Sequence, residues 1–336
     1  GNDGSFVIYV GPTATGSVVT GLTLRNAEDG VLAEGRFDFV RNRVHRTGDA
    51  LDYQRGDATA PSGGLVANSV LEDNFDDGID FDNAVALTVI RNTIRNNRDG
   101  GIEIRFDDYT GPLLEIVIAE NTIVDNRENG IQLIDVNGVT DRTVRIERNV
   151  IAANDDVGIG TMPNGNTMEA FTGGDLEELV VIANNTIVAN SYGITAGDNM
   201  AIVNNLIADN PGVGLKRARQ DSIAAYNLLW NNGTDVEDVI LDEATTVRRD
   251  PRLDASYAPA PNSAAVDLGT AAFIFGGSDV IDLSAAEYSG SAPDLGAFEF
   301  DWSANARFID VPQGHLFFSE VQWLAAERIT LGCNPP

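Results

Sequence analysis

One phrase of hydrophobic and polar residues recurs along the first two thirds of the chain. It consists of a β-rich triplet, an Asn, two or three apolar residues, a second Asn, and then Gly followed by Ile. The clearest copy runs from Ile116 to Ile131, and other copies start at Leu87, Val144, Val180 and Ala201, with weaker ones near Val18, Phe39, Gly64 and Ile223. Alternating Val and Ile are typical of short strands with one face in a core. Each copy therefore predicts a set of short strands.

Aligned copies contain two recurrent Asn positions. The first Asn falls at Asn42, Asn68, Asn92, Asn121, Asn149, Asn185, Asn205 and Asn227, with Gly21 in the first copy. The second falls five residues later, at Asn26, Asn97, Asn126, Asn154, Asn190, Asn210 and Asn232. Because an Asn amide both donates and accepts, stacked copies can form hydrogen-bonded columns along an axis. The Gly before Ile permits a bend that a Cβ would obstruct.

The repeat predicts an all-β right-handed parallel β-helix of about nine or more coils over residues 1–235. Steps between first Asn residues vary from 20 to 36, which a solenoid tolerates because insertions bulge from one turn. A leucine-rich repeat would need Leu where Ile and Val stand, and a sandwich would not keep one Asn column. The phrase resembles the parallel β-helix repeat of secreted bacterial surface proteins and carbohydrate-active enzymes, over about residues 6–232.

Two further resemblances lie after the repeat. Residues 236–300 resemble the closing segment of bacterial β-helix proteins of the "choice-of-anchor Q" kind, through Asp250, Pro251, Pro261, Ser263, Ala264, Asp267, Gly269, Asp294, Gly296, Ala297 and Glu299. This resemblance implies a capping segment over the open end of the solenoid.

Residues 301–336 resemble the opening half of an S-layer homology module, with a short helical fragment. The matching residues are Phe308, Asp310, Val311, Pro312, His315, Val321, Trp323, Leu324, Ile329, Thr330 and Gly332. This second resemblance implies a truncated anchor and a secreted protein attached to the cell envelope.

The composition limits the classes of binding partner and of site that are expected for this protein. With 51 acidic and 22 basic residues, the net charge of −29 repels nucleic acid. No apolar run is long enough for membrane insertion. The single cysteine, Cys333, permits no disulfide within the chain. Zinc and Ser-His-Asp sites are disfavoured because His45 is the only histidine in the solenoid. A polysaccharide or cell-wall glycan is the expected partner, and the protein is expected to be a monomer.

Insertions follow the Gly-Ile strand in successive copies and are expected to form one wall beside a groove. They run from Asp52 to Gly63, Phe81 to Ala86, Glu103 to Leu114, Gln132 to Arg142 and Gly160 to Glu178. Stacking also predicts an outward column formed by Asp52, Asp80, Glu103, Gln132, Gly160, Thr195 and Lys216.

Like charges on neighbouring strands destabilise a sheet unless something compensates them. One interpretation is Ca²⁺ bound by Asp80, Asp82 and Glu103, and the other is a carboxyl that keeps its proton at neutral pH. Candidate catalytic residues are Asp80, Glu103 and Arg105, acting either as a polysaccharide lyase or as a glycoside hydrolase. Candidate substrate-binding residues are Asp52, Tyr53, Tyr109, Gln132, Lys216 and Arg217.

For a lyase, Arg105 or Ca²⁺ would neutralise a uronate carboxylate, and the candidate bases are Tyr53, Tyr109, Lys216 and Arg217. The sequence therefore favours a surface protein that binds and possibly cleaves a polysaccharide along the insertion-lined groove. A non-catalytic envelope adhesin or structural spacer remains the alternative, since neither the repeat nor the two C-terminal segments require catalysis.

Overall fold

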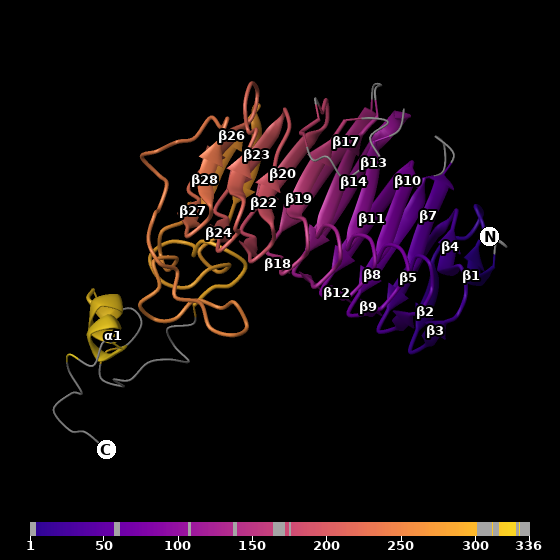
Figure 1. Ribbon diagram of the computed structural model, residues 1–336, viewed down its shortest axis with the longest axis horizontal. Coiled ribbons are helices and arrows are strands. Elements are labelled where there is room, and N and C mark those ends of the chain that lie inside the picture. The colour runs from indigo at the N-terminus through magenta and orange to yellow at the C-terminus, as the bar shows by residue number, and fades with distance from the viewer. Residues whose placement is uncertain are drawn as a thin grey trace, which may run out of the picture.

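A computed structural model of the chain places three parallel sheets around one long core (Figure 1). The structure describes residues 5–56, 61–106, 109–136, 140–163, 172–174, 176–300, 311, 316–326 and 329. Each turn of the chain contributes one strand to each sheet, so that every sheet follows the order of the sequence. The predicted all-β parallel β-helix is confirmed, with nine complete coils and one additional strand.

Sheet A contains β1 (Phe6–Val10), β4 (Asp29–Ala33), β7 (Leu51–Gly56), β10 (Ile79–Asn83), β13 (Ile102–Phe106), β16 (Ile131–Asp135), β19 (Val157–Met162), β22 (Tyr192–Thr195), β25 (Val213–Lys216) and β28 (Thr234–Glu237). Sheet B contains β2 (Ser17–Thr20), β5 (Arg36–Val40), β8 (Ser62–Ala67), β11 (Val85–Ile90), β14 (Tyr109–Ala119), β17 (Thr140–Glu147), β20 (Leu179–Ala183), β23 (Met200–Val203) and β26 (Ile223–Ala225). Sheet C contains β3 (Thr23–Arg25), β6 (Arg43–His45), β9 (Val70–Glu72), β12 (Thr93–Arg95), β15 (Thr122–Val124), β18 (Val150–Ala152), β21 (Thr186–Val188), β24 (Leu206–Ala208) and β27 (Leu228–Trp230).

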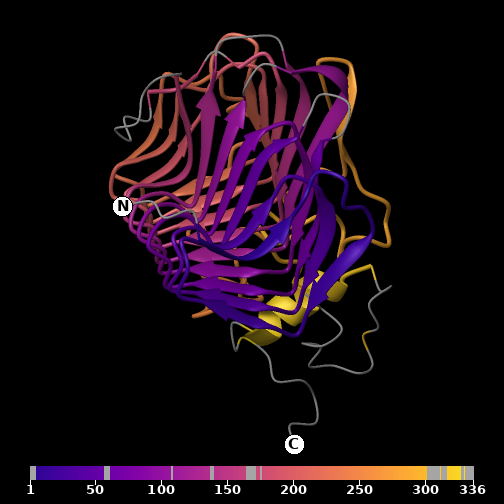
Figure 2. The same ribbon diagram turned by 90° about the vertical axis from the view of Figure 1, so that its right-hand side faces the viewer.

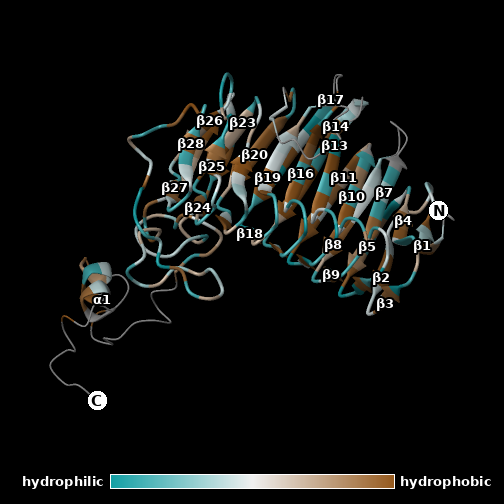
Figure 3. Ribbon diagram, viewed as in Figure 1, coloured by the Kyte–Doolittle hydropathy of each residue, from teal (hydrophilic) through white to brown (hydrophobic). Residues whose placement is uncertain are grey.

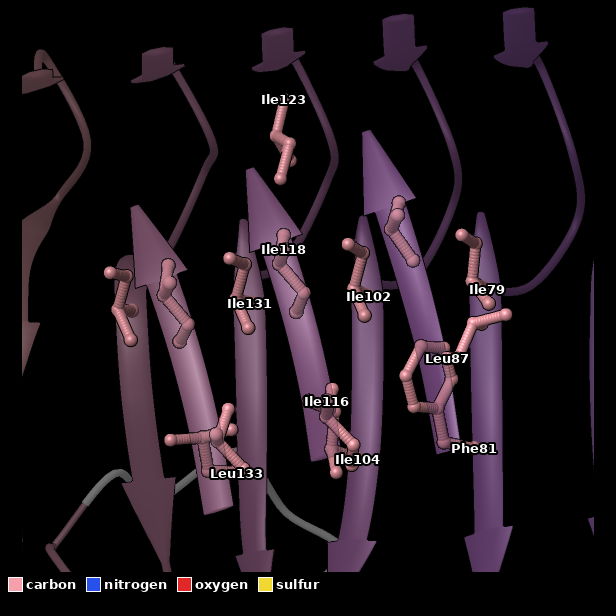
Figure 4. Packing of buried hydrophobic residues seen from close by; sticks show 14 of the residues in the cluster. Ile79, Phe81, Leu87, Ile102, Ile104, Ile116, Ile118, Ile123, Ile131 and Leu133 are labelled. Atoms are coloured by element: carbon pink, nitrogen blue, oxygen red, sulfur yellow. The ribbon is translucent and has the colours of Figure 1, made fainter. Parts of the chain in front are cut away.

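The core consists of aliphatic residues stacked one coil above another. Ile79, Ile102 and Ile131 are register partners on successive strands of sheet A, and all three are fully buried (Figure 4). Because successive residues of a strand point to opposite faces, inward and outward positions alternate. Figure 3 shows this alternation as changes between hydrophobic and hydrophilic colour along the strands. The core therefore fixes which residues of sheet A face outward.

Two ladders of buried Asn side chains run along the solenoid. In the first, the Asn121 side chain accepts from the backbone N–H of Asn92 at 2.9 Å and donates to Asn149 Oδ1 at 3.0 Å. The second repeats this arrangement, with Asn97 donating to Asn126 Oδ1 at 3.0 Å. The predicted hydrogen-bonded columns are confirmed.

The first ladder departs from the predicted alignment in two coils. In the first coil Leu22, not Gly21, occupies the ladder position, and its backbone N–H donates to Asn42 Oδ1 at 2.9 Å. The second departure lies two coils later. Ser69, not Asn68, occupies the ladder position, and its backbone N–H donates to Asn92 Oδ1 at 2.9 Å. Asn68 has a φ of 52° and takes the left-handed position just before the ladder residue. Asn26, with a φ of 62°, takes the equivalent left-handed position just before the second ladder in the first coil. Asn tolerates this conformation better than most residues, which explains why both positions resembled ladder sites in the sequence.

The glycine before the Ile of each sheet A strand is required by close packing. A Cβ on Gly101 would lie 2.5 Å from Ile123 Cγ2 and 2.6 Å from the carbonyl oxygen of Gly130. No side chain fits at those distances without moving the next coil. This contact explains the recurrent Gly-Ile pair.

The segment after β28 both continues the solenoid and folds back along its outside. Leu241 and Val247 form parallel bridges to β26 and β27, and Leu241 packs against the end of the core. The hairpin of β29 (Ala272–Phe275) and β30 (Ser278–Asp282) packs on the outer face of β20 and β23 in sheet B. Ala265 and Leu295 pack on the outer face of sheet C. Figure 2 shows this segment on the outside of the coils.

This segment therefore covers side faces of the last coils as well as closing their end. Neither of its apolar contact clusters includes a residue of sheet A, within the described chain. α1 (Phe318–Ala326) is the one helix among the described residues. Phe308, Asp310, Pro312, His315, Thr330 and Gly332 of the S-layer resemblance lie outside the described residues. No helix in the described chain is long and apolar enough to cross a membrane.

Candidate functional site

The outward column predicted on sheet A is present in the structure. Register pairs join Asp52 to Asp80, Asp80 to Glu103, and Glu103 to Gln132. The column then continues through Gly160, Thr195 and Lys216. Neighbouring members lie one strand apart, which is about 4.8 Å in a sheet. Three carboxyl side chains therefore follow one another on the outer face of sheet A.

Arg105 compensates part of this charge. Its guanidinium forms ion pairs with Glu103 and with Asp82 Oδ1, the latter at 3.3 Å. Burial lowers the pKa of Arg105, but Glu103, Asp80 and Asp82 raise it more, so the guanidinium stays charged. Arg105 thus pairs with two of the three acids of the predicted metal group, whose oxygens are not among the groups that converge within 4.8 Å in the described chain, and that group stays a prediction.

A second set of acids, not predicted from the sequence, lies at the start of the same strands. Asp29, Asp49 and Asp77 occupy equivalent positions in three successive coils, each just before the small residue that precedes the strand's apolar anchor. The backbone N–H of Asp77 donates to Asp49 Oδ1 at 2.9 Å, and that of Gly100 donates to Asp77 Oδ1 at 2.7 Å. These three residues form an aspartate ladder beside the outward column.

The aspartate ladder differs chemically from the Asn ladders. An Asn side chain can donate to the next one, whereas an ionised Asp side chain can only accept. Stacked aspartates therefore repel one another unless a proton or a cation lies between them. Burial, followed by the charges of neighbouring acids, raises the pKa of Asp49 to about 8. The same causes raise the pKa of Asp77 well above its ordinary value.

Carboxylate oxygens converge at two places along this ladder. Oxygens of Asp49, Asp76 and Asp77 lie within 4.8 Å of one another, and so do oxygens of Asp29, Asp49 and Asp52. Among the described residues, none of these five acids is ion-paired with an arginine or lysine. Several carboxylate oxygens at one point are the ligands that Ca²⁺ takes.

An unpaired atom of the second group supports this fit. Asp52 Oδ1 is buried and has no hydrogen-bond partner among the described residues, and the same holds for Asp80 Oδ1, which lies outside both groups. A buried acceptor without a partner is costly, and a cation removes that cost. Burial and nearby acids also raise the pKa of Asp52 to about 7 and that of Asp80 to about 9. The residues present therefore suit a hard divalent cation.

Tyr53 was predicted to bind substrate, and the structure corrects this prediction. It follows the outward Asp52, so its side chain points inward and is fully buried. Its ring stacks on Phe37, with centroids 5.8 Å apart, and meets the edge of Phe81 at 5.9 Å. Its hydroxyl oxygen has no hydrogen-bond partner among the described atoms. Tyr53 is therefore a core residue and cannot act as the base of a lyase.

Replacing Tyr53 with Phe is expected to leave glycan binding unchanged and to stabilise the fold. The variant keeps the ring contacts and removes a buried hydroxyl without a partner, which costs about 1 kcal/mol or more. Thermal unfolding would show a rise in Tm, and a clear fall would mean that the hydroxyl makes an unseen contact. Phe81→Leu serves as a control that disturbs the same aromatic stack.

Tyr109 and Gln132 are also buried and therefore not accessible to a substrate. Tyr109 lies at the start of β14 between Ala84 and Leu114, and its hydroxyl donates to the carbonyl oxygen of Pro112 at 2.9 Å. Gln132 belongs to the outward column, but its Oε1 accepts from Asn129 Nδ2 at 2.7 Å and only 2% of its surface is exposed. The predicted substrate-binding role of both is corrected, because their polar atoms face protein.

Lys216 and Arg217 are too distant to join the acidic group. Lys216 lies five strands from Asp80 in sheet A, which is roughly 24 Å. Its Nζ is 3.1 Å from Glu237 Oε1. Arg217 follows it, and its side chain lies against Gly173. These residues cannot supply the base for chemistry at Asp80, which corrects the prediction that placed them in one site.

A sequence signal for the aspartate ladder existed. Acidic residues precede the Gly-Ile pair, or its equivalent, in four successive coils: Asp29, Asp49 and Asp77 at the ladder position, and Asp99 one residue before it. The predicted outward column consists of residues that follow the apolar anchor of each strand, whereas the aspartate ladder consists of residues that precede this anchor. In each of these coils, the aspartate ladder lies at the start of the sheet A strand, and the outward column lies on the strand itself.

A cavity between the closing segment and α1 lies away from the acidic residues of sheet A. Its volume is about 480 Å³, and Arg249, Arg252 and Trp323 are among the residues that line it. None of the predicted site residues lines it. The acidic residues instead lie on and beside sheet A, where Asp52, Asp77 and Glu103 are buried.

Comparisons with known proteins agree with this fold. Residues 7–172 match the family model described as a right-handed β-helix region. No curated protein matches the sequence. The crystal structure of pectate lyase Pel9A is similar with a TM-score of 0.51 and 16% identity, covering 88% of this chain and 86% of that one.

Two further solved structures match less closely. XylC in complex with xylose has a TM-score of 0.47 and 13% identity, over 67% of this chain and 43% of that one. The periplasmic alginate epimerase AlgG has a TM-score of 0.36 and 14% identity, over 65% and 60% of the two chains. Geometry and comparisons together identify the chain as a right-handed parallel β-helix.

Proposed function

We propose that the protein binds an acidic polysaccharide along the outer face of sheet A, through Ca²⁺ held by the aspartate ladder and through Arg105. The observation that carries this proposal is the convergence of the Asp49, Asp76 and Asp77 carboxylates. Asp76 and Asp77 lie in the coil next to that of Arg105, whose guanidinium pairs with Glu103 of the outward column and with Asp82.

Charge supports the involvement of a cation. A protein with a net charge of −29 repels a polyanion at long range, so attraction needs local positive charge. A bound Ca²⁺ would supply this charge by neutralising the carboxylate of a uronate. Arg105 can offer a second contact, since guanidinium groups pair well with carboxylates. The two contacts would define successive positions along a polymer.

The architecture supports a linear ligand. The closing segment packs on sheets B and C, so its apolar contacts leave the face of sheet A to other partners. Pectate lyase Pel9A has the same fold over most of both chains, and pectate is a polymer of uronate. A polyuronate is therefore the substrate class we propose for this chain.

A second candidate function is cleavage of the bound chain by Asp80 and Glu103. These are register partners on adjacent strands, so their carboxyls start about 5 Å apart, the separation used by retaining glycosidases. The pKa of Asp80, raised to about 9 by burial, keeps it protonated as an acid requires. Glu103, held by Arg105, would serve as the nucleophile.

Calorimetric titration with polygalacturonate, in calcium and in EDTA, tests the binding. We expect binding in calcium, a loss of at least about tenfold in EDTA, and a similar loss for Asp77→Asn. Asp125→Asn is the matched control, because Asp125 is exposed in the turn after β15, two coils from Asp77. Equal affinity in calcium and EDTA, or for a neutral glucan, would contradict the proposal.

Product analysis separates cleavage from binding. New reducing ends without new ultraviolet absorbance would indicate hydrolysis, and absorbance from an unsaturated uronate would indicate a lyase. Asp80→Asn is expected to abolish turnover while binding persists. Binding without any product would make the protein a non-catalytic adhesin or structural surface protein.

We also propose that the protein is secreted and attached to the cell envelope. Residues 236–300 and 301–336, through their resemblance to a closing segment and an S-layer homology module, support this location. Fractionation of cells that produce the protein would test it.

A further inference from the structure

We propose that the acidic site holds two Ca²⁺ ions, one at Asp49, Asp76 and Asp77 and a second at Asp29, Asp49 and Asp52, with Asp49 shared between them. This inference rests on the proposed function, because it extends the same site toward the N-terminal coils. It adds an ion and assigns a bridging residue.

The two groups of ligands follow one another along the solenoid axis. Asp29 comes from the start of β4, Asp49 and Asp52 from the next coil, and Asp76 and Asp77 from the coil after that. Oxygens within each group lie within 4.8 Å of one another, and Asp49 belongs to both groups. One ion cannot serve all five acids, because the two groups converge at different points.

Asp52 supplies the independent observation for the second ion. Only 7% of its surface is exposed, and its Oδ1 has no hydrogen-bond partner within the part of the chain that the structure describes. Its other oxygen accepts from Gln54 Nε2 at 2.9 Å. Asp52 is not part of the group around Asp77, so an ion bound there would leave Asp52 Oδ1 without a partner among the described residues. An ion at the second group satisfies it.

The charge balance of the site also favours two Ca²⁺ ions. A single Ca²⁺ among five carboxylates leaves an excess of three negative charges, whereas two ions leave one. Arg105 pairs with Glu103 and Asp82 rather than with these five acids. A carboxylate has two oxygens, which allows Asp49 to contact both ions while it accepts the N–H of Asp77.

Native mass spectrometry and calorimetric titration of the full chain with CaCl₂, after EDTA treatment, test this inference. We expect two ions on the wild-type protein and one ion on Asp29→Asn, with the remaining site within about threefold of its original affinity. Asp76→Asn is expected to lose the other ion. Asp49→Asn should weaken both sites by at least about tenfold.

Asp125→Asn is the control and should retain two ions. Each Asp→Asn change keeps the side-chain shape and removes repulsion, so circular dichroism in EDTA should show an unchanged fold for all variants. One ion on the wild type, with Asp29→Asn unaffected, would overturn the two-ion inference and leave the proposed function standing. No bound ion on the wild type would overturn both.

Discussion

In EDTA, the protein is expected to lose stability as the pH rises from about 5 to about 9, and saturating calcium is expected to reverse this trend. The cause is the set of buried acids on sheet A. Burial raises the pKa of Asp29 to about 6, of Asp52 to about 7 and of Asp49 to about 8. Over this range the folded protein holds protons that the unfolded chain has already released. Folding stability must therefore fall as the pH rises through these values.

The effect is large because several groups contribute. One pKa unit corresponds to about 1.4 kcal/mol, but partial exposure and mutual coupling make the sum of single shifts an upper limit. We expect a loss on the order of 5 kcal/mol in the free energy of unfolding, or roughly 10 °C in Tm. Calcium binds the deprotonated carboxylates, so its stabilising effect grows with pH.

Differential scanning calorimetry at several pH values, with EDTA or calcium, measures this behaviour. Asp49→Asn should flatten the pH dependence in EDTA, because it removes the central charge of the aspartate ladder. Asp125→Asn, at an exposed corner, should behave like the wild type. Stability that increases with pH in EDTA would show that the acids are ionised without cost.

The fold was predictable because a solenoid repeats its sequence requirements. Every coil needs an inward Ile or Val at the same place, and a period of two then fixes the outward residues. The register of Asp52, Asp80, Glu103 and Gln132 followed from the position of the apolar anchor alone. The Asn ladders followed from the need to satisfy buried polar groups between coils.

The predictions for Tyr53 and Tyr109 were wrong because the strands of their coils are longer than the repeat indicated. Residues from Asp52 onward were interpreted as an insertion, yet β7 continues to Gly56 and keeps its alternation. Tyr53 is inward for that reason. Likewise, Tyr109 begins β14, which is a long strand of sheet B and not an exposed loop. Where a strand is longer than its equivalents in other coils, the loop lengths of those coils do not predict which way its side chains point.

The site was only partly predictable because its charge balance depends on contacts between coils. The sequence indicated excess acid on sheet A, but not that Arg105 would pair with Glu103 and Asp82. Nor did it show that the Asp49 side chain accepts the N–H of Asp77 in the next coil. Asp82 and Arg105 come from adjacent coils, and Asp49 and Asp77 are 28 positions apart, so only the stacked structure brings these groups together.

Asn121→Ala is expected to destabilise the protein by about 3–5 kcal/mol, since it breaks the first Asn ladder in its middle. The Asn121 side chain accepts from the N–H and the amide of Asn92 and donates to the carbonyl oxygen of Val89 and to Asn149 Oδ1. Only 1% of its surface is exposed, so water cannot replace these partners. Chemical denaturation should show a lower midpoint.

The ladder itself offers a matched comparison, because Ser69 occupies the same position two coils earlier. Asn121→Ser should therefore cost less than Asn121→Ala, since a hydroxyl can still accept the N–H of Asn92. Thr122→Ala, at the neighbouring exposed position, should change stability by less than about 0.5 kcal/mol. Each coil contacts only its neighbours, so a break at Asn121 weakens the coupling between the two halves of the solenoid. Unfolding of Asn121→Ala should thus become broader or separate into two transitions, and a single sharp transition at the wild-type midpoint would show that the ladder contributes little to stability.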